Sequence, residues 1–201
     1  MTAARPRRFP WARVVVGAVG LAASTKAARA EVVHPVEDRA FRSFNGLPSA
    51  LLPPSFVLMQ AGSYVALLGV SGVLAVTGRH RAGVAAAAAG TLSWLGCKAV
   101  KARIGRGRPP AHLEDVATRG PIDTGLGFPS GHSAVAFTMA GVVAPQLPPS
   151  LRPLVHGWAV VVGTSRMYVG AHLPLDVVGG ASMGLAVGAV GGWLAAPDPV
   201  N

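Results

Sequence analysis

Charged residues are scarce in this chain. Asp, Glu, Lys and Arg make up 13% of its 201 residues, against about 25% in an ordinary soluble domain. Hydrophobic residues make up 51%, and the missing charge leaves long uncharged stretches. This composition indicates a membrane protein, and the length suits one domain.

Cysteine and acidic residues are also few. The single cysteine, Cys97, excludes an intrachain disulfide and lies in an apolar stretch, where it acts as a small hydrophobe. Only 8 acidic residues face 18 Lys and Arg, which gives a net charge of +10. A basic chain can bind nucleic acid, but here the basic residues lie at segment ends and aromatics make up only 6%. We therefore expect no nucleic-acid partner.

Five apolar segments predict an all-α, polytopic membrane bundle. They cover residues 55–77, 82–97, 133–147, 154–164 and 177–197. The first has 23 uncharged residues, and a helix of that length spans about 30 Å of hydrocarbon. The third and fourth segments are shorter than the roughly 20 residues that a span needs. Their polar ends are therefore expected to lie within a site.

The N-terminal segment has two interpretations. Four arginines precede the apolar residues 14–24: Arg5, Arg7, Arg8 and Arg13. Residues 28–30 (Ala-Arg-Ala) resemble a signal-peptidase site, so the segment is either a cleaved signal or a retained helix. We favour the retained helix, which predicts about six transmembrane helices, or five with a cleaved signal.

Three regions follow from this division. Residues 1–30 are the basic N-terminus with the first helix or signal-like segment. Residues 31–54 are expected to form an interfacial helix around 36–44 and a loop. Residues 55–197 are the membrane domain. The sequence predicts no oligomeric state.

Positive charge predicts the orientation. With a first helix near residue 14, the N-terminal arginines lie on the same side as Arg79, Arg81 and Arg152, which the positive-inside rule assigns to the cytoplasm. The opposite side then carries five positive charges within 98–108, against the rule. An anionic substrate explains them, so we expect an extracytoplasmic site in a bacterial cell membrane.

A first cluster, residues 101–109, supplies cations. Lys101 and Arg108 are seven residues apart, close to two helical turns, so they are expected to share a face of a helix that Pro109 ends. Guanidinium groups bind phosphate through two hydrogen bonds, and an ammonium acts as a point charge. Arg103 and Arg106 have an equally good alternative role as contacts to lipid headgroups.

A second cluster, residues 128–132, begins a helix. The N-terminus of a helix has unpaired N–H groups that favour anions. Ser130 is expected to cap the helix or to bind phosphate, and Gly131 lets the backbone approach closely. His132 is placed to protonate a leaving alkoxide. By itself this cluster is weak evidence for catalysis, because a histidine at such a position more often caps the helix or packs against neighbouring side chains.

A third cluster, residues 165–176, contains a histidine and a carboxylate one turn apart. Asp176 can take the Nδ1 proton of His172 across Pro174, which a first helical turn tolerates, and so leaves Nε2 as a nucleophile. Arg166 adds a further positive charge for the phosphate oxygens. His132, His172 and Asp176 could in principle bind zinc. The surrounding Lys and Arg side chains argue against a cation, so we expect no metal and no cofactor.

Together, the three clusters resemble the signature of the type 2 phosphatidic acid phosphatase family. That signature is Lys, six residues, Arg-Pro; Pro-Ser-Gly-His; and Ser-Arg, five residues, His, three residues, Asp. The chain matches it from Lys101 to Asp176 without departure. The resemblance implies His172 as nucleophile, Asp176 as its orienter and His132 as general acid. It implies five phosphate-binding residues: Lys101, Arg108, Ser130, Gly131 and Arg166. The family's membrane members have about six helices with the site at the outer face, in agreement with the charge pattern.

The leading functional hypothesis is a metal-independent membrane lipid phosphatase that works through a phosphohistidine. The resemblance implies a polyprenyl (pyro)phosphate, a polyprenyl-phosphosugar phosphate, phosphatidate or phosphatidylglycerol phosphate as substrate. One alternative is a lipid phosphotransferase with the same chemistry. Another is a non-enzymatic membrane scaffold, against which the complete motifs argue. The soluble acid phosphatase and haloperoxidase branches of the wider superfamily do not fit the long apolar segments.

Overall fold

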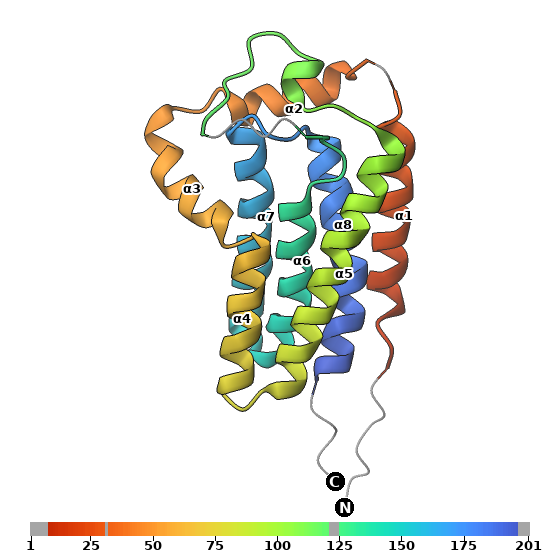
Figure 1. Ribbon diagram of the computed structural model, residues 1–201, viewed down its shortest axis with the longest axis vertical. Helices are drawn as coiled ribbons and strands as arrows, with labels where there is room; N and C mark the ends of the chain where they lie inside the picture. Colours follow the sequence, from red (N-terminus) through yellow and green to blue (C-terminus); the bar gives the residue numbers. More distant parts are fainter. Residues whose placement is uncertain (1–7, 31, 121–124, 197–201) are drawn as a thin grey trace, which may run out of the picture.

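The computed structural model describes residues 8–30, 32–120 and 125–196. Every regular element in these ranges is a helix, as predicted. Helix α8 (Pro174–Ala195) lies at the centre, against α1 (Trp11–Ala27), α5 (His80–Ile104) and α6 (Gly131–Val143). Helix α7 (Arg152–Tyr168) packs on α6, and α4 (Tyr64–Val76) packs on α5. Figure 1 shows these helices running side by side along the long axis.

The two ends of the bundle differ. Helix α2 (Pro35–Asn45) and the connection between α5 and α6 cover one end, which we call the α2 end (Figure 1). The α4–α5 and α6–α7 connections lie at the opposite end, where α1 begins and α8 ends. The helix expected around 36–44 is therefore present, capped by His34, whose Nδ1 accepts a hydrogen bond from the Val36 N–H at 3.2 Å. The division of the chain into three regions stays a prediction.

Close contact between α6 and α8 fixes the α2 end. A Cβ atom on Gly180 would collide with the Ser130 carbonyl, so the two backbones can approach this closely only with glycine there. Glycines further along α8, Gly184 and Gly188, face the α6 backbone in the same way. Small residues at helix contacts are typical of membrane bundles. The contact brings the beginning of α6 beside the beginning of α8.

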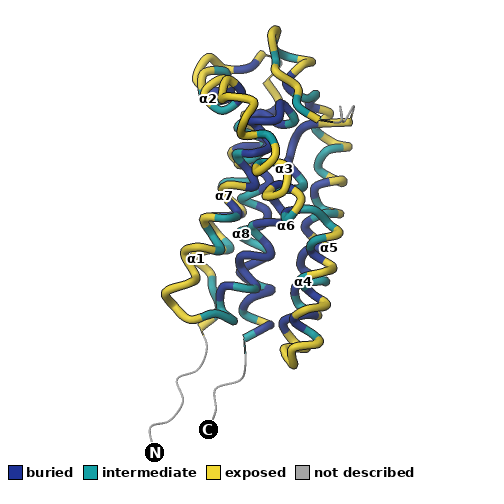
Figure 2. The backbone as a smooth tube through the Cα atoms, turned by 90° about the vertical axis from the view of Figure 1, so that its left-hand side faces the viewer, coloured by how far each residue is buried: buried dark blue, intermediate teal, exposed yellow. Residues whose placement is uncertain are grey.

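The outer surface of the bundle is apolar. Large aliphatic side chains such as Val65, Val76, Val84, Leu92 and Leu154 are exposed. In Figure 2 the exposed residues follow the outer faces of α1, α4 and α5, whereas few residues of α6 and α8 are exposed. Such an exterior suits contact with hydrocarbon.

Only some of the predicted spans meet a length and hydropathy criterion. Among the described residues, two helical stretches are long and apolar enough to cross a membrane, His80–Ala111 and Pro174–Ala195. A bent pair, Ser49–Gln60 with Tyr64–Val76, makes a third if it counts as one span. The expectation of about six spans is not confirmed, because α1, α6 and α7 have only 17, 13 and 17 residues. Helix α1 packs along α8, and its retention in the membrane stays a prediction.

The prediction of one continuous helix over 55–77 was wrong. The segment contains most of α3 (Leu52–Gln60) and all of α4, with a bend of 54° between them. The Ser63 hydroxyl caps α4 by accepting the Ala66 N–H at 3.1 Å. Gly62 packs so tightly against α7 that a Cβ atom would lie 2.5 Å from Val162 Cγ1. The cap begins α4 and the contact fixes the bend, so that α3 leaves the line of α4 and packs against α7.

The expectation that α5 continues to Pro109 was also wrong. The helix ends at Ile104, because Gly105 adopts a left-handed conformation (φ 70°) and donates its N–H to the Lys101 carbonyl. Arg108 has an extended backbone instead. Lys101 and Arg108 therefore do not share a helical face, and Arg108 reaches the site from a loop.

Candidate active site

Hydrogen bonds to backbone carbonyls join the three sequence clusters at the α2 end. The Ser130 N–H donates to the Asp176 carbonyl at 2.8 Å, which links the second cluster to the third. Arg108 Nη1 donates to the Ala171 carbonyl at 2.9 Å and links the first to the third. The Gly127 N–H donates to the Arg106 carbonyl at 2.8 Å and so joins the first cluster to the segment before Pro129. Residues more than 60 positions apart thus form one site.

His172 and Asp176 lie as their spacing predicts. His172 precedes α8 and Asp176 lies in its first turn, with Pro174 as the first helical residue between them. The His172 Nδ1 and Asp176 Oδ2 atoms are 3.4 Å apart, and both side chains are buried. The Leu173 N–H also donates to Oδ2, at 2.9 Å. These contacts orient the imidazole ring.

Ser130 and His132 occupy the beginning of α6. Ser130 is the N-cap, and its hydroxyl accepts the Ser133 N–H at 3.5 Å. Gly131 is the first helical residue, and His132, the second, is half-buried. The capping role expected of Ser130 is therefore present, whereas its contact with phosphate stays a prediction.

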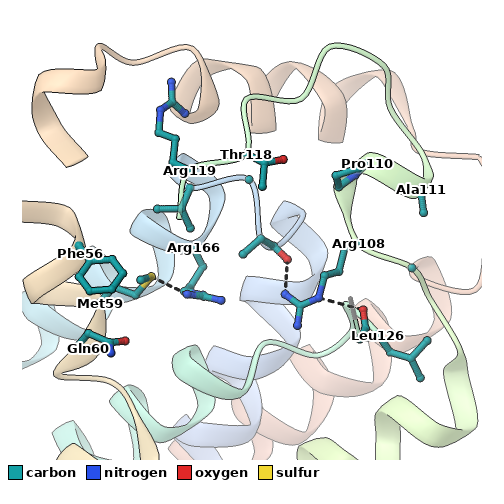
Figure 3. A pocket seen from close by; sticks show the side chains of 15 residues that line it. Phe56, Met59, Gln60, Arg108, Pro110, Ala111, Thr118, Arg119, Leu126 and Arg166 are labelled. Carbon is teal, nitrogen blue, oxygen red and sulfur yellow. Dashed lines mark hydrogen bonds between the residues drawn. The ribbon is translucent and has the colours of Figure 1, made fainter. Parts of the chain in front are cut away.

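Arg108 and Arg166, together with Arg119, line a cavity of about 530 Å³ at this end. Figure 3 shows the guanidinium groups of Arg108 and Arg166 on either side of the same space. Arg108 Nε donates to the Gly125 carbonyl at 3.0 Å. Arg166 Nη1 contacts the sulfur of Met59, from α3, at 2.6 Å. The carbonyl of Arg166 accepts the His172 N–H at 3.2 Å, so this arginine and the histidine are held together.

Lys101 has a different environment from the one expected. Its Nζ donates to the carbonyls of Leu126 at 2.6 Å and Gly127 at 2.7 Å. Lys101, His132 and His172 lie outside the cavity lining, although Ala171, which precedes His172, is part of it. Lys101 therefore holds the loop before Pro129, and its contact with phosphate stays a prediction.

Two residues near His172 were not among the predicted site residues, Glu37 and Arg106. Arg106 is buried, and its guanidinium bonds to Asp176 and to Glu37, on α2. Arg103, for which a headgroup contact was equally expected, is exposed. The position of Arg106 between Lys101 and Arg108 was a signal for its role. Glu37 carries no such signal, because it lies 69 residues away in an amphipathic helix.

The other groups near the cavity have structural partners. Arg119, in the loop between α5 and α6, donates to the carbonyls of Asn45, Leu47 and Tyr168. Within the described ranges, no group of three or more His, Cys, Asp or Glu side chains is arranged to hold a metal ion. The expectation of a metal-free site stays a prediction.

Two solved structures are similar to this chain. The crystal structure of LpxE from Aquifex aeolicus superposes with a TM-score of 0.71 at 27% identity, over 80% of this chain and 98% of that one. A phosphatidylglycerolphosphate phosphatase of the PAP2 type from Bacillus subtilis aligns at 24% identity over 89% of this chain and 92% of that one, with a TM-score of only 0.41.

Sequence relatives cover a shorter stretch. Phosphatidylglycerophosphatase B of Escherichia coli is 38% identical over 77 residues, which is 36% of this chain and 30% of that protein. This chain therefore matches less than a third of the relative's length. The family model described as the PAP2 superfamily matches residues 81–196, more than half of the chain and all three clusters. The chain belongs to the PAP2 superfamily, whose phosphatases hydrolyse phosphate esters.

Proposed function

We propose that this protein is an integral membrane lipid phosphatase that hydrolyses its substrate through a phosphohistidine on His172. The observation that carries the proposal is the buried His172–Asp176 pair, whose Nδ1 and Oδ2 atoms are 3.4 Å apart. Backbone bonds hold this pair beside Arg166, and Ala171 connects it to Arg108. A nucleophile oriented by a carboxylate, with cations next to it, is the arrangement that phosphoryl transfer requires.

Each step of the mechanism uses a named side chain. Asp176 accepts the Nδ1 hydrogen bond, and Nε2 of His172 attacks phosphorus as the bond to the lipid oxygen breaks. His132 gives its proton to the leaving alkoxide. Water then attacks the phosphohistidine and loses its proton to His132, which releases phosphate and restores both histidines.

Fixed positive charge binds and neutralises the phosphate. Arg108 and Arg166 line the cavity, and Lys101, in the last turn of α5, bonds to the carbonyls of Leu126 and Gly127. Ser130 and Gly131 add the N-terminus of α6, where N–H groups favour an anion. In this proposal the cations supply the charge stabilisation for which other phosphatases use metal ions, so no metal and no cofactor takes part.

The cavity wall suits an amphipathic substrate. Phe56 and Met59 from α3, with Leu126 and Val169, give the wall an apolar part beside the two arginines. A phosphate head would bind at Arg108 and Arg166 while an apolar tail extends toward the bilayer. Candidate substrates are polyprenyl (pyro)phosphates, polyprenyl-phosphosugar phosphates, phosphatidate and phosphatidylglycerol phosphate. The names of the Escherichia coli and Bacillus subtilis relatives make the last of these the first to test.

We place the protein in the bacterial cell membrane as a multi-pass protein. Its apolar exterior and long apolar helices support this location. We place the site on the extracytoplasmic face, because Arg13, Arg79, Arg81 and Arg152 lie at the opposite end, which the positive-inside rule assigns to the cytoplasm. Its partners are the lipid substrate and the surrounding membrane lipids, with no nucleic acid.

The test is phosphate release from a panel of these lipids by the purified protein in detergent. We expect release from at least one lipid, persistence in excess chelator, inhibition by vanadate and no release by His172→Ala. Addition of an acceptor lipid distinguishes hydrolysis from transfer, because a phosphotransferase would phosphorylate the acceptor. Loss of activity in chelator, restored by one particular metal, would contradict the metal-free mechanism.

A further inference from the structure

A buried cluster of three charged groups connects the nucleophile to α2. Arg106 Nη1 lies 3.2 Å from Asp176 Oδ1 and 3.0 Å from Glu37 Oε1, and Nη2 lies 2.8 Å from Glu37 Oε2. The exposed fractions of the three side chains are 3% for Arg106, 0% for Asp176 and 6% for Glu37. We call these residues the Glu37–Arg106–Asp176 cluster.

Arg106 completes the set of contacts around the Asp176 carboxylate. Oδ2 is occupied by the Leu173 N–H and the His172 ring, and Oδ1 receives the guanidinium. With both oxygens held, the carboxylate cannot rotate without breaking a hydrogen bond. A buried carboxylate without a partner is also costly. Arg106 therefore fixes the carboxylate's orientation and compensates its charge.

Glu37 fixes Arg106 in turn. The two carboxylate oxygens of Glu37 accept from both Nη atoms, a geometry that sets the plane of the guanidinium. Oε1 also accepts the Leu175 N–H, in the first turn of α8, at 3.0 Å. Glu37 thus aligns Arg106 with the helix that carries Asp176.

The charge of the cluster matches the proposed reaction. Two carboxylates and one guanidinium leave one negative charge beside His172. Attack through Nε2 while Nδ1 keeps its proton gives the imidazole ring one positive charge, which this cluster would neutralise. Without Glu37 the remaining pair would be neutral, and the charged ring would have less stabilisation in a buried site.

We propose that Arg106, held by Glu37, is a positioning residue for catalysis that acts through Asp176 on His172. The inference rests on the proposed function. It assigns a role to Arg106, one of two arginines of residues 101–108 that the family signature does not include, and to an acidic residue on α2. If the cluster only attached α2 to the bundle, loss of Arg106 would lower the stability of the protein. Its effect on kcat would then be the same with Asp176 and with Asn at that position.

A double-mutant cycle separates these two roles. Arg106→Gln, Asp176→Asn and the double variant are compared by kcat and KM for lipid phosphate release. We expect Arg106→Gln to lower kcat by about tenfold to a hundredfold, the range for loss of a charge-assisted hydrogen bond, with KM nearly unchanged. In the Asp176→Asn background the same change should lower kcat by less than about twofold. Losses that multiply would overturn the proposal.

Two matched controls carry the same chemical changes outside the cluster. Arg103→Gln removes an arginine from the same segment, and Asp38→Asn removes the carboxylate next to Glu37 on α2. Both should keep wild-type kcat. Arg106→Lys restores the charge but not the two-pronged contact, so its kcat should lie between wild type and Arg106→Gln.

A replacement variant and the wild-type activity separate failure of this inference from failure of the proposed function. If Arg106→Gln does not fold, Glu37→Gln replaces it in the cycle, and it too should lose its effect on kcat once Asp176 is Asn. If the wild type releases phosphate but the losses of kcat in the cycle multiply, only the positioning role is contradicted. Absence of release by the wild type from every lipid in the panel contradicts the proposed function, and the inference with it.

Discussion

The two histidines of the site have different environments. His172 is buried and paired with Asp176, whereas His132 is half-buried at the beginning of a helix, after the Ser130 cap. A nucleophile needs a fixed tautomer, which the carboxylate supplies. A proton donor needs access to the leaving group and to water. The surroundings of each residue thus fit the role proposed for it.

Removal of each histidine should therefore have a different effect. His172→Ala removes the nucleophile, so turnover should fall by several orders of magnitude on every substrate. His132→Ala removes the proton donor, which an aryl phosphate with a good leaving group needs less. Relative to wild type, His132→Ala should keep more activity on aryl phosphate than on lipid phosphate. Steady-state assays of both variants on both substrates test this. Equal losses of activity for the two variants on both substrates would contradict the assignment of roles.

Local sequence predicted the parts of the site that depend on local geometry. One helical turn separates His172 from Asp176, and the Ser130 cap belongs to the helix that it begins. Arg106 and Glu37 lie 69 residues apart in sequence, and their contact depends on how α2 packs against α8, so no spacing rule predicts it. Only the three-dimensional arrangement shows which of several nearby basic residues is buried against a carboxylate.

At the scale of elements, helix ends were harder to predict than helices. Apolar runs indicated the helices correctly, but Gly62–Ser63 and Gly105 end helices inside uncharged or basic stretches that hydropathy cannot divide. The bend before α4 brings Met59 to Arg166 and so forms a wall of the cavity. The left-handed Gly105 moves Arg108 into a loop. Both departures from the prediction shape the site.

The contact between α6 and α8 can be tested with a single methyl group. Gly180→Ala places a Cβ atom against the Ser130 carbonyl, so the helices must separate. Alanine normally favours a helix over glycine by about 1 kcal/mol, but crowding of this kind costs about 1–3 kcal/mol. We expect a lower midpoint of thermal unfolding in detergent and reduced phosphatase activity, because Ser130 moves.

A matched variant controls for the change in helix propensity. Gly72→Ala lies on an exposed face of α4, where a Cβ atom meets nothing within 4 Å. Its unfolding midpoint should equal or exceed that of the wild type. Equal midpoints for the two variants would show that α6 and α8 do not need this close approach.

For the whole molecule, the proposed orientation rests on the basic residues at the end of the bundle opposite the site. Arg13, Arg79 and Arg152 lie where α1 begins and where the α4–α5 and α6–α7 connections turn, whereas the site lies at the α2 end (Figure 1). The positive-inside rule then directs the first end to the cytoplasm. The cations of the site break that rule in sequence, and their hydrogen bonds with carbonyls and carboxylates at the α2 end explain why they are there.

This orientation can be tested with two threonines, one at each end. Thr118 is exposed at the α2 end, and Thr77 is exposed where α4 ends. Each is changed to cysteine in a Cys97→Ala background, which removes the buried native thiol. In intact cells an impermeant thiol reagent should label Thr118→Cys and not Thr77→Cys, because only the α2 end faces outward. Permeabilised cells should give labelling at both positions, which controls for accessibility. The reverse pattern in intact cells would place the site, and the lipid phosphate that it binds, at the cytoplasmic leaflet.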